Sequence, residues 1–257
     1  MTRRPLDLIV NADDFGISGE NTAATVSLME RGRVTSATIL ANGEDLEPAL
    51  AAARRLPGCS FGVHLNLTEG VPLTDTSDLA PLLDDDGRLH PIIFAAQITR
   101  TLLRGIEREW MAQVERIRTA GVPVSHLDSH QHVHTIPRLF LAFKSVQKKT
   151  GIRKARITKT LYDTASPPGS SLLLVKKRLW NFALRNYVRT RTTDGFSDFN
   201  SFIRASRERP LSLGTLEVMV HPGADNELGF HDEIEVLESS WEDQLPFPVR
   251  LLSYHEL

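Results

Sequence analysis

The chain has 257 residues, of which 41% are hydrophobic and 24% are charged, so its composition is that of a globular protein with a sizeable core. The net charge of −2 gives no basis for binding nucleic acid or an anionic membrane, and no apolar run approaches the roughly 18 residues that span a bilayer. The single cysteine, Cys59, excludes an internal disulfide framework and is typical of a cytoplasmic protein.

Strand-like and helix-like segments alternate along the chain. We expect strands at 6–10, 34–41, 61–67, 122–128, 152–158, 216–220 and 249–253. We expect helices at 18–31, 45–56, 106–117, 139–146, 172–189 and 234–241, with Ser18 capping the first and Gly151 ending the fourth. This alternation predicts a parallel α/β fold, and the lack of a repeat or linker predicts a single domain, 1–257.

Polar side chains follow four of the predicted strands. They are Asp13 with Asp14, His64, the tract His126–His134, and His221. In α/β proteins the carboxyl ends of the strands form the face on which active sites are built, both in barrels and in open sheets. We favour an irregular barrel of about seven or eight strands, because four strand ends would converge in it. Taken singly, each feature has a simpler explanation, such as a helix cap or a core histidine.

The histidine tract allows two geometries. In a strand, His126 and Asp128 share a face, whereas in a helical turn His130 pairs with His134 at positions i and i+4. Either arrangement builds a metal site, and a solvated histidine-rich loop is the alternative without a function.

One aspartate and two histidines make a three-donor set with open positions, which is typical of a catalytic metal. Adjacent residues of a strand point to opposite sides, so one of Asp13 and Asp14 can bind the metal while the other stays free as a base. A histidine opposite the base would protonate the leaving group. Together these groups predict hydrolysis of an amide or an ester.

Four motifs resemble those of the YdjC-like carbohydrate deacetylases. They are Asn11–Gly16, Gly62–Thr68, His126–His134 and His221–Gly223, and they occur in the right order. The resemblance runs from about residue 6 to the C-terminus. It implies an irregular parallel (β/α) barrel related to the polysaccharide deacetylases, one divalent metal ion (Mg²⁺ or Zn²⁺), and a homodimer. It also implies removal of the N-acetyl group from an N-acetylglucosamine-containing, chitin-type oligosaccharide.

The resemblance further implies a role for each matching residue. Asp14, His64 and His130 would be the metal ligands. Asp13 would be the catalytic base and His221 the catalytic acid.

Other residues are expected to support the metal ligands or to contact the substrate. They are Asn66, Asp128, His132 and His134, with Asp128 orienting a histidine. Phe15, Trp180 and Phe196 are possible platforms for a sugar ring, although we expect at least two of these three to be core residues. Segments 69–95 and 159–200 match no motif and are expected to shape the sugar pocket.

Two other functions compete with deacetylation. A metallo-phosphoesterase usually has a basic residue or a second metal beside the first metal, and no basic residue lies within the motifs, although Arg138 is close. A protein that only binds a metal or a sugar has no need of a free carboxylate such as Asp13. The basic residues between Lys176 and Arg191 are expected to be a solvated helix face.

Overall fold

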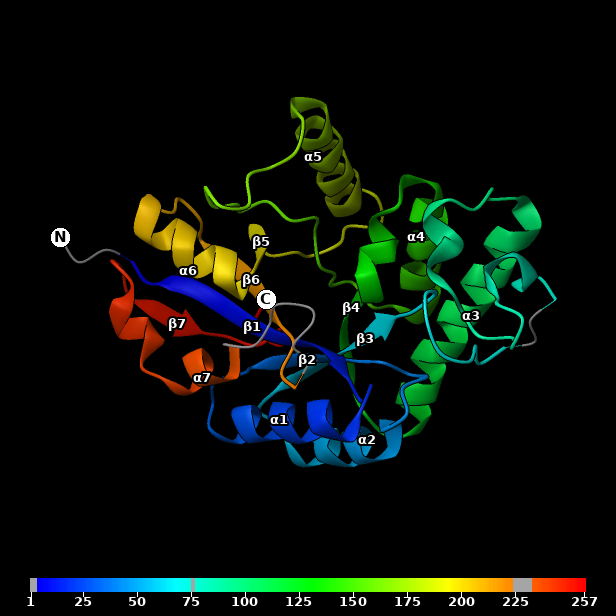
Figure 1. The fold of residues 1–257 in the computed structure, drawn as a ribbon, viewed down its shortest axis with the longest axis horizontal. Helices are drawn as coiled ribbons and strands as arrows, with labels where there is room; N and C mark the ends of the chain where they lie inside the picture. Colours follow the sequence, from blue (N-terminus) through cyan, green and yellow to red (C-terminus); the bar gives the residue numbers. More distant parts are fainter. Residues whose placement is uncertain (1–3, 75–76, 224–232) are drawn as a thin grey trace.

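The computed structural model describes residues 4–74, 77–223 and 233–257, and a parallel β-sheet lies at its centre (Figure 1). The strands are β1 (Leu6–Phe15), β2 (Ser36–Ile39), β3 (Ser60–Leu65), β4 (Val124–Ser129), β5 (Gly195–Asp198), β6 (Thr215–Val220) and β7 (Val249–Leu251). They are ordered β4-β3-β2-β1-β6-β5, and β7 pairs with the start of β1. Every pairing between these strands is parallel, which confirms the predicted α/β class.

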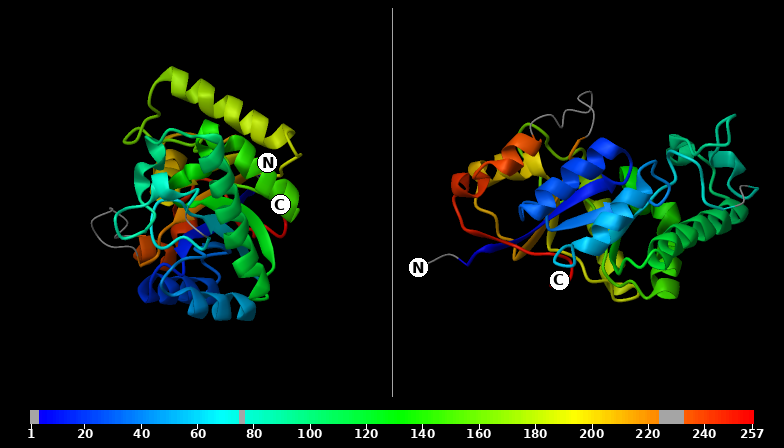
Figure 2. Two further views of the ribbon diagram at one scale, coloured as in Figure 1. Left: turned by 90° about the vertical axis from the view of Figure 1, so that its right-hand side faces the viewer. Right: turned by 90° about the horizontal axis from the view of Figure 1, so that it is seen from below.

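Helices lie around the sheet. They are α1 (Gly19–Glu30), α2 (Leu46–Arg55), α3 (Arg100–Thr119), α4 (Phe140–Thr150), α5 (Ser171–Asn186), α6 (Phe199–Glu208) and α7 (Glu233–Glu238). Short 3₁₀ turns are η1 (Ala80–Leu82), η2 (Pro91–Phe94), η3 (His130–Thr135), η4 (Pro137–Leu139) and η6 (Trp241–Gln244). Figure 1 shows α3 and α4 beside β3 and β4, and α6 beside β5 and β6. Figures 1 and 2 place α5 at the periphery, on the side away from α1 and α2.

Two helix ends follow the predicted capping signals. The Ser18 side chain accepts a hydrogen bond from the Asn21 amide at the start of α1, and Gly151 ends α4 with a left-handed φ of 74°. The last predicted helix is shorter than expected, because α7 ends at Glu238 and a separate 3₁₀ turn begins at Trp241.

The strand ladder does not close, which corrects the prediction of a barrel. Segment 152–158, predicted as a strand, runs between β4 and β5 and pairs with β4 only where Ala155 lies opposite Leu127. Farther along, the Thr160 amide donates to the Phe196 carbonyl of β5. Because this segment touches its neighbours at single points and not along a ladder, the sheet is open but barrel-like.

The segment between α4 and α6 contains one predicted helix, α5, and one strand that was not predicted, β5. The predicted helix 172–189 corresponds to α5, and the exposed side chains of Lys176 and Arg178 confirm a solvated basic face. β5 was missed because its four residues are too few for alternation to indicate a strand. In the ranges that the structure describes, no helix is long and apolar enough to cross a membrane.

The two faces of β1 have different surroundings. Leu8, Val10 and Ala12 lie in the main hydrophobic core between the sheet and the helices. Ile9 lies in a separate small cluster with Leu252 and Tyr254. Because side chains alternate along a strand, the buried Asn11 and Asp13 continue the face of Ile9 toward the carboxyl edge of the sheet.

Candidate metal centre and active site

Three predicted metal ligands meet at the carboxyl edge of the sheet. Asp14 lies near the end of β1, His64 lies on β3, and His130 begins η3 directly after β4. Asp14 Oδ1 is 3.0 Å from His64 Nε2 and 2.7 Å from His130 Nδ1. Donor atoms of all three residues lie within 4.8 Å of one another, which is close enough for them to share one ion. We refer to these three residues as the triad.

Left-handed backbone conformations bring these side chains together. Asp14 has a φ of 60°, and Gln131 and His132 have φ values of 49° and 56°. Residues other than glycine seldom adopt this region, and such conformations are concentrated at functional sites. At Asp14 the conformation interrupts the alternation of β1, so the carboxylates of Asp13 and Asp14 both lie beside His64.

His64 is held between two carboxylates. Its Nδ1 donates to Asp128 Oδ1 at 2.7 Å, and the Thr38 hydroxyl donates to the other Asp128 oxygen at 3.1 Å. Burial disfavours the charged imidazole, but Asp128 and Asp14 outweigh burial and raise the pKa of His64 well above its usual value. A metal-binding histidine usually donates its second N–H to a carboxylate, so Asp128 lies where its predicted orienting role requires.

His130 has a similar partner in Glu69, a residue that sequence analysis left unassigned. His130 Nε2 lies 3.4 Å from Glu69 Oε2, while its Nδ1 faces Asp14. Burial lowers the pKa of His130, but hydrogen bonds to Asp14 and Glu69 outweigh burial and raise it to about 9. Glu69 follows β3 closely in sequence, and this position at a strand end was the available signal for it.

Asp13 is bound by Arg156. The guanidinium donates to both Asp13 oxygens at 2.6 Å, and Asn11 Nδ2 donates to Asp13 Oδ1 at 2.9 Å. Burial alone would raise the pKa of Asp13, but the charge and hydrogen bonds of Arg156 outweigh burial and hold this pKa well below its usual range. Asp13 is therefore ionised throughout the neutral range.

Arg156 also binds two further carboxylates in the interior. Its Nη1 lies 2.8 Å from Asp128 Oδ2, and its Nε donates to Glu217 Oε1 at 2.8 Å. The second Glu217 oxygen accepts a hydrogen bond from the Tyr254 hydroxyl at 2.6 Å. Sequence analysis missed Arg156 because it is one of four basic residues between positions 153 and 159, and nothing in this weak strand signal distinguishes it from the others. Arg138, the basic residue noted instead, is exposed and donates to loop carbonyls.

Asp13, His64 and Asp128 form a second group with donor atoms within 4.8 Å, but this group does not fit a metal ion. The Arg156 guanidinium is bonded to both carboxylates, and His64 Nδ1 is already bonded to Asp128. A cation would have to displace a permanently charged guanidinium. The triad, with one oxygen and two nitrogen donors, is the group that fits a divalent ion.

His221 approaches the triad from the opposite edge of β1. It follows β6, which pairs with β1 on the edge opposite to β2, and its Nε2 lies 4.0 Å from Asp14 Oδ2. The His221 backbone N–H donates to the buried Glu233 carboxylate at 2.8 Å. Burial raises the pKa of Glu233 to about 8. His221 therefore lies where an acid facing the metal ligands would be needed.

Two histidines of the tract lie outside the triad. His134 is fully buried, accepts a hydrogen bond from the Ser129 hydroxyl at 2.6 Å, and donates to the Arg156 carbonyl at 3.3 Å. Burial, and then the neighbouring His132, lower the pKa of His134 well below its usual value. The ring of His132 meets Phe196 edge-on, and burial followed by Arg156 lowers the pKa of His132 to about 3. Both side chains support the loop at neutral charge.

Asn66 braces the loop that follows β3. Its Nδ2 donates to Asn42 Oδ1 at 3.0 Å and to the Glu69 carbonyl at 2.8 Å, and its Oδ1 accepts from the Thr68 amide at 2.9 Å. Gln113 on α3 bonds to both backbone groups of Asn66. Asn66 therefore holds the site and has little capacity left for a sugar hydroxyl.

The three aromatic residues proposed as sugar platforms lie in packed environments. Phe15 is fully buried and stacks on Phe61. Phe196 is 1% exposed, with the Arg156 guanidinium 4.6 Å from its ring centre. Trp180 is 8% exposed and packs edge-on against Phe140. This confirms the expectation that at least two of the three are core residues.

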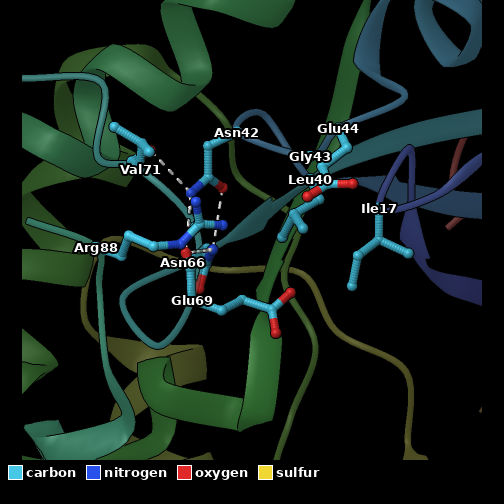
Figure 3. A pocket seen from close by; sticks show the side chains of 10 residues that line it. Ile17, Leu40, Asn42, Gly43, Glu44, Asn66, Glu69, Val71 and Arg88 are labelled. Atoms are coloured by element: carbon cyan, nitrogen blue, oxygen red, sulfur yellow. Dashed lines mark hydrogen bonds between the residues drawn. The ribbon is translucent and has the colours of Figure 1, made fainter. Parts of the chain in front are cut away.

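Two pockets adjoin the site. The first, which we call the β2–β3 pocket, has a volume of about 470 Å³ and is shown in Figure 3. Its lining includes Ile17, Leu40, Glu44, Glu69, Val71 and Arg88. The second, which we call the α5 pocket, has a volume of about 310 Å³ and lies against α5. Its lining includes His132, Pro137, Leu173, Lys176, Trp180 and Phe196.

Curated proteins of similar sequence are carbohydrate deacetylases by name. A Brevibacillus brevis carbohydrate deacetylase is 30% identical over 98% of this chain and 93% of its own length. An Oceanobacillus iheyensis carbohydrate deacetylase is 29% identical over 83% of this chain and 84% of its own. An Escherichia fergusonii chitooligosaccharide deacetylase is 35% identical over 63% of this chain and 64% of its own.

The fold is similar to that of a solved structure. A crystal structure from Enterococcus faecalis V583, of a protein whose name refers to cellobiose-phosphate cleavage, superposes with a TM-score of 0.76 at 23% identity, covering 98% of this chain and 99% of that one. At this identity the likeness concerns the fold alone. The sequence profile of the YdjC-like proteins matches residues 7–246, which is nearly the whole chain. The chain therefore belongs to the YdjC-like protein family.

Proposed function

We propose that this protein is a metal-dependent carbohydrate N-deacetylase that acts on an N-acetylglucosamine unit of a chitin-type oligosaccharide. The observation that carries the proposal is the triad with a separate ionised carboxylate, Asp13, beside it. The names of the related proteins support a carbohydrate substrate and the loss of an acetyl group.

Asp14, His64 and His130 would hold the metal. Two imidazoles and one carboxylate suit Zn²⁺ or another transition metal better than Mg²⁺, which prefers oxygen ligands. A divalent cation held there would polarise the acetyl carbonyl and make a water molecule more acidic. Asp128 and Glu69 would keep the two imidazoles turned toward the metal through their second nitrogens.

Asp13 would act as the base that takes the proton of the attacking water. A carboxylate has about four lone-pair positions, and in the described ranges Arg156 and Asn11 donate three hydrogen bonds to it. One position therefore remains for a proton from the reaction. Arg156 keeps Asp13 ionised and fixes its direction, since a guanidinium does not lose its proton in proteins.

His221 would act as the acid. An amine leaves an amide only if its nitrogen gains a proton, and His221 approaches Asp14 from the edge of β1 opposite to the other two histidines. Its imidazole side chain is 16% exposed, so it lies at the surface where the leaving sugar would depart.

A phosphoesterase would need a basic group beside the metal that is free to bind phosphate, and this geometry offers little support for one. Arg156 is the basic group beside the triad, but it is fully buried and donates to Asp13, Asp128 and Glu217. It has no face available to clamp a phosphate, which phosphoryl transfer requires.

Mass spectrometry tests the proposal directly. The purified protein, supplied with Zn²⁺ or with Mg²⁺, is incubated with N-acetylglucosamine, its dimer and its trimer. We expect acetate release and a product in which one acetyl group is replaced by hydrogen. Acetate released only from an amide that contains no sugar would overturn the substrate, and phosphate release from phosphoesters without acetate release would overturn the reaction. The homodimer stays a prediction, which sedimentation of the same sample tests.

A further inference from the structure

We infer that the β2–β3 pocket binds the sugar unit next to the one that loses its acetyl group. This inference rests on the proposed function and extends it to a second, neutral sugar ring. The pocket volume of about 470 Å³ lies within the range of roughly 300–1,000 Å³ that is usual for small-molecule sites.

The pocket adjoins the triad at two points. Glu69, in its wall, contacts His130 of the triad. Ile17, also in the lining, donates its backbone N–H to the Asp14 carbonyl at 2.9 Å. A substrate whose acetyl group lies over the triad would therefore have this pocket as direct neighbour.

The wall of the pocket is built before any sugar arrives. Asn42 Nδ2 donates to the carbonyls of Glu69 and Val71 at 3.0 and 3.1 Å, and Asn66 bonds to Asn42. Gly70 has a left-handed φ of 72°, and a Cβ there would lie 2.9 Å from Asn42 Nδ2. The loop can close this tightly only because a glycine stands at that position. A preformed wall reduces the entropy lost when a ligand binds.

The groups that line the pocket suit a sugar ring. Glu44 and Arg88 are exposed, and their side chains make no hydrogen bond or ion pair with any residue that the structure describes. Figure 3 shows them on different sides of the pocket. Carboxylate and guanidinium groups accept from and donate to hydroxyls. Ile17, Leu40 and Val71 add an apolar surface for the C–H face of the ring.

The α5 pocket is a poorer site for a neutral sugar. Its lining is mainly apolar, with Leu173, Trp180 and Phe196 among the residues. Two of its lysines are already bonded, Lys159 to Asp198 and Lys177 to the Tyr162 hydroxyl. Sugar hydroxyls would lose water there and gain few partners, which is costly.

Calorimetry tests the inference separately from the reaction. Binding of the N-acetylglucosamine dimer, with Zn²⁺ present, is measured on Asp13→Asn protein, in which turnover should be slow. Arg88→Ala and Glu44→Ala, which each remove one polar group from the β2–β3 pocket, are then added singly, and Lys176→Ala, which alters the α5 pocket, is the matched control. We expect each of the first two substitutions to lower the affinity for the dimer about tenfold, because each removes about one hydrogen bond to the second sugar. The control and the affinity for the monosaccharide should stay within about twofold.

Three results would overturn the inference. The first is an unchanged dimer affinity in both Arg88→Ala and Glu44→Ala, and the second is no binding of the dimer at all. The third is a weaker dimer affinity in Lys176→Ala alone, which would place the second sugar in the α5 pocket. Acetate release by the unmodified protein, measured in parallel, reports on the proposed function whichever pocket is used.

Discussion

Asp13 and Asp14 are adjacent in sequence, but their carboxylates have partners of different kinds. Asp14 Oδ1 faces two imidazoles, which can each lose a proton and leave room for a cation. Asp13 faces the guanidinium of Arg156, which keeps its proton at any pH a protein tolerates. In the proposed reaction it is therefore the partner, more than the carboxylate, that would make Asp14 the metal ligand and Asp13 the base.

The first prediction separates the histidines of the tract. His130→Ala should lose the bound metal, whereas His134→Ala should keep it and lose stability, by about 1–3 kcal/mol for the buried partners left unpaired. Metal content by mass spectrometry and thermal melting measure the two effects. A His134→Ala protein without metal and a His130→Ala protein with metal would contradict the triad.

The second prediction concerns the base. Asp13→Asn keeps the shape of the side chain but cannot take the proton, so kcat should fall by roughly 10²–10⁴-fold. The metal should stay bound, because Asp13 is not in the triad. Activity close to that of the unmodified protein, at equal metal content, would move the base elsewhere, with Asp128 next to be tested.

The third prediction concerns pH and the buried Glu233. Its pKa of about 8 in the folded protein lies above the ordinary value of 4.5, so the folded state binds more protons than the unfolded state between these values. The stability gained from the protonated carboxyl is complete below about pH 4.5 and is lost as pH rises through about 8. Glu233→Gln removes this dependence and can still accept the His221 amide hydrogen.

Urea denaturation of both proteins from pH 5 to 9 measures the effect. The free energy of unfolding of the unmodified protein, relative to Glu233→Gln, should fall with pH at a slope of up to about 1.4 kcal/mol per pH unit. Parallel pH curves for the two proteins would show that Glu233 is ionised when folded.

The C-terminal segment after β7, residues 252–257, packs at the amino end of the sheet, opposite the triad. The Tyr254 ring stacks on His126 with centroids 3.6 Å apart, and its amide donates to the Ser60 hydroxyl at 2.9 Å. Its hydroxyl donates to Glu217 on β6, which in turn accepts from Arg156. β3, β4, β6 and the C-terminal segment are thus joined by one buried polar network, whose members depend on one another.

The fourth prediction tests this connection. Tyr254→Phe keeps the stacking but leaves one Glu217 oxygen unpaired in a buried place, so the protein should lose about 1–3 kcal/mol of stability. Tyr162→Phe is the control, because the Tyr162 hydroxyl bonds to groups near the surface and should cost less than about 1 kcal/mol. Equal losses in the two variants, measured by urea denaturation, would argue against the network.

Over the whole molecule, the candidate metal site and the hydrophobic core are separate. The triad lies at the carboxyl edge, while the core lies between the sheet and the helices that surround it. We therefore expect that folding does not require a bound metal, in contrast to a small zinc domain.

The fifth prediction follows from this separation. Chelation should abolish deacetylation and leave the circular dichroism spectrum of the folded protein. Adding Zn²⁺ at about 100 times its Kd should raise the free energy of unfolding by about 2.7 kcal/mol, and His64→Ala should remove that gain. A protein that unfolds on chelation would contradict the separation.

Alternation and capping in the sequence predicted most elements well. β2, β3, β4, β6 and β7 all lie within or near predicted strands, because each has a short run of alternating or β-branched residues between clear breaks. The strand prediction for segment 152–158 was wrong because this segment meets its neighbours at single points. β5 was missed because its four residues are too few to show alternation, although all four pair with β6. Local patterns do not report how long a pairing between distant segments will be.

The sequence by itself determined the residue types of the site and their places at strand ends, because a parallel sheet brings such ends to one edge. The family resemblance named Asp14, His64 and His130, but the residue pattern by itself left their grouping open, and only the tertiary structure decided which side chains meet. It set His130, and not His134, beside Asp14, through left-handed backbone at Gln131 and His132. It also brought Arg156 onto Asp13, across a gap in the sheet that no local pattern indicates. Contacts between residues far apart in the chain depend on packing, and packing is a property of the whole fold.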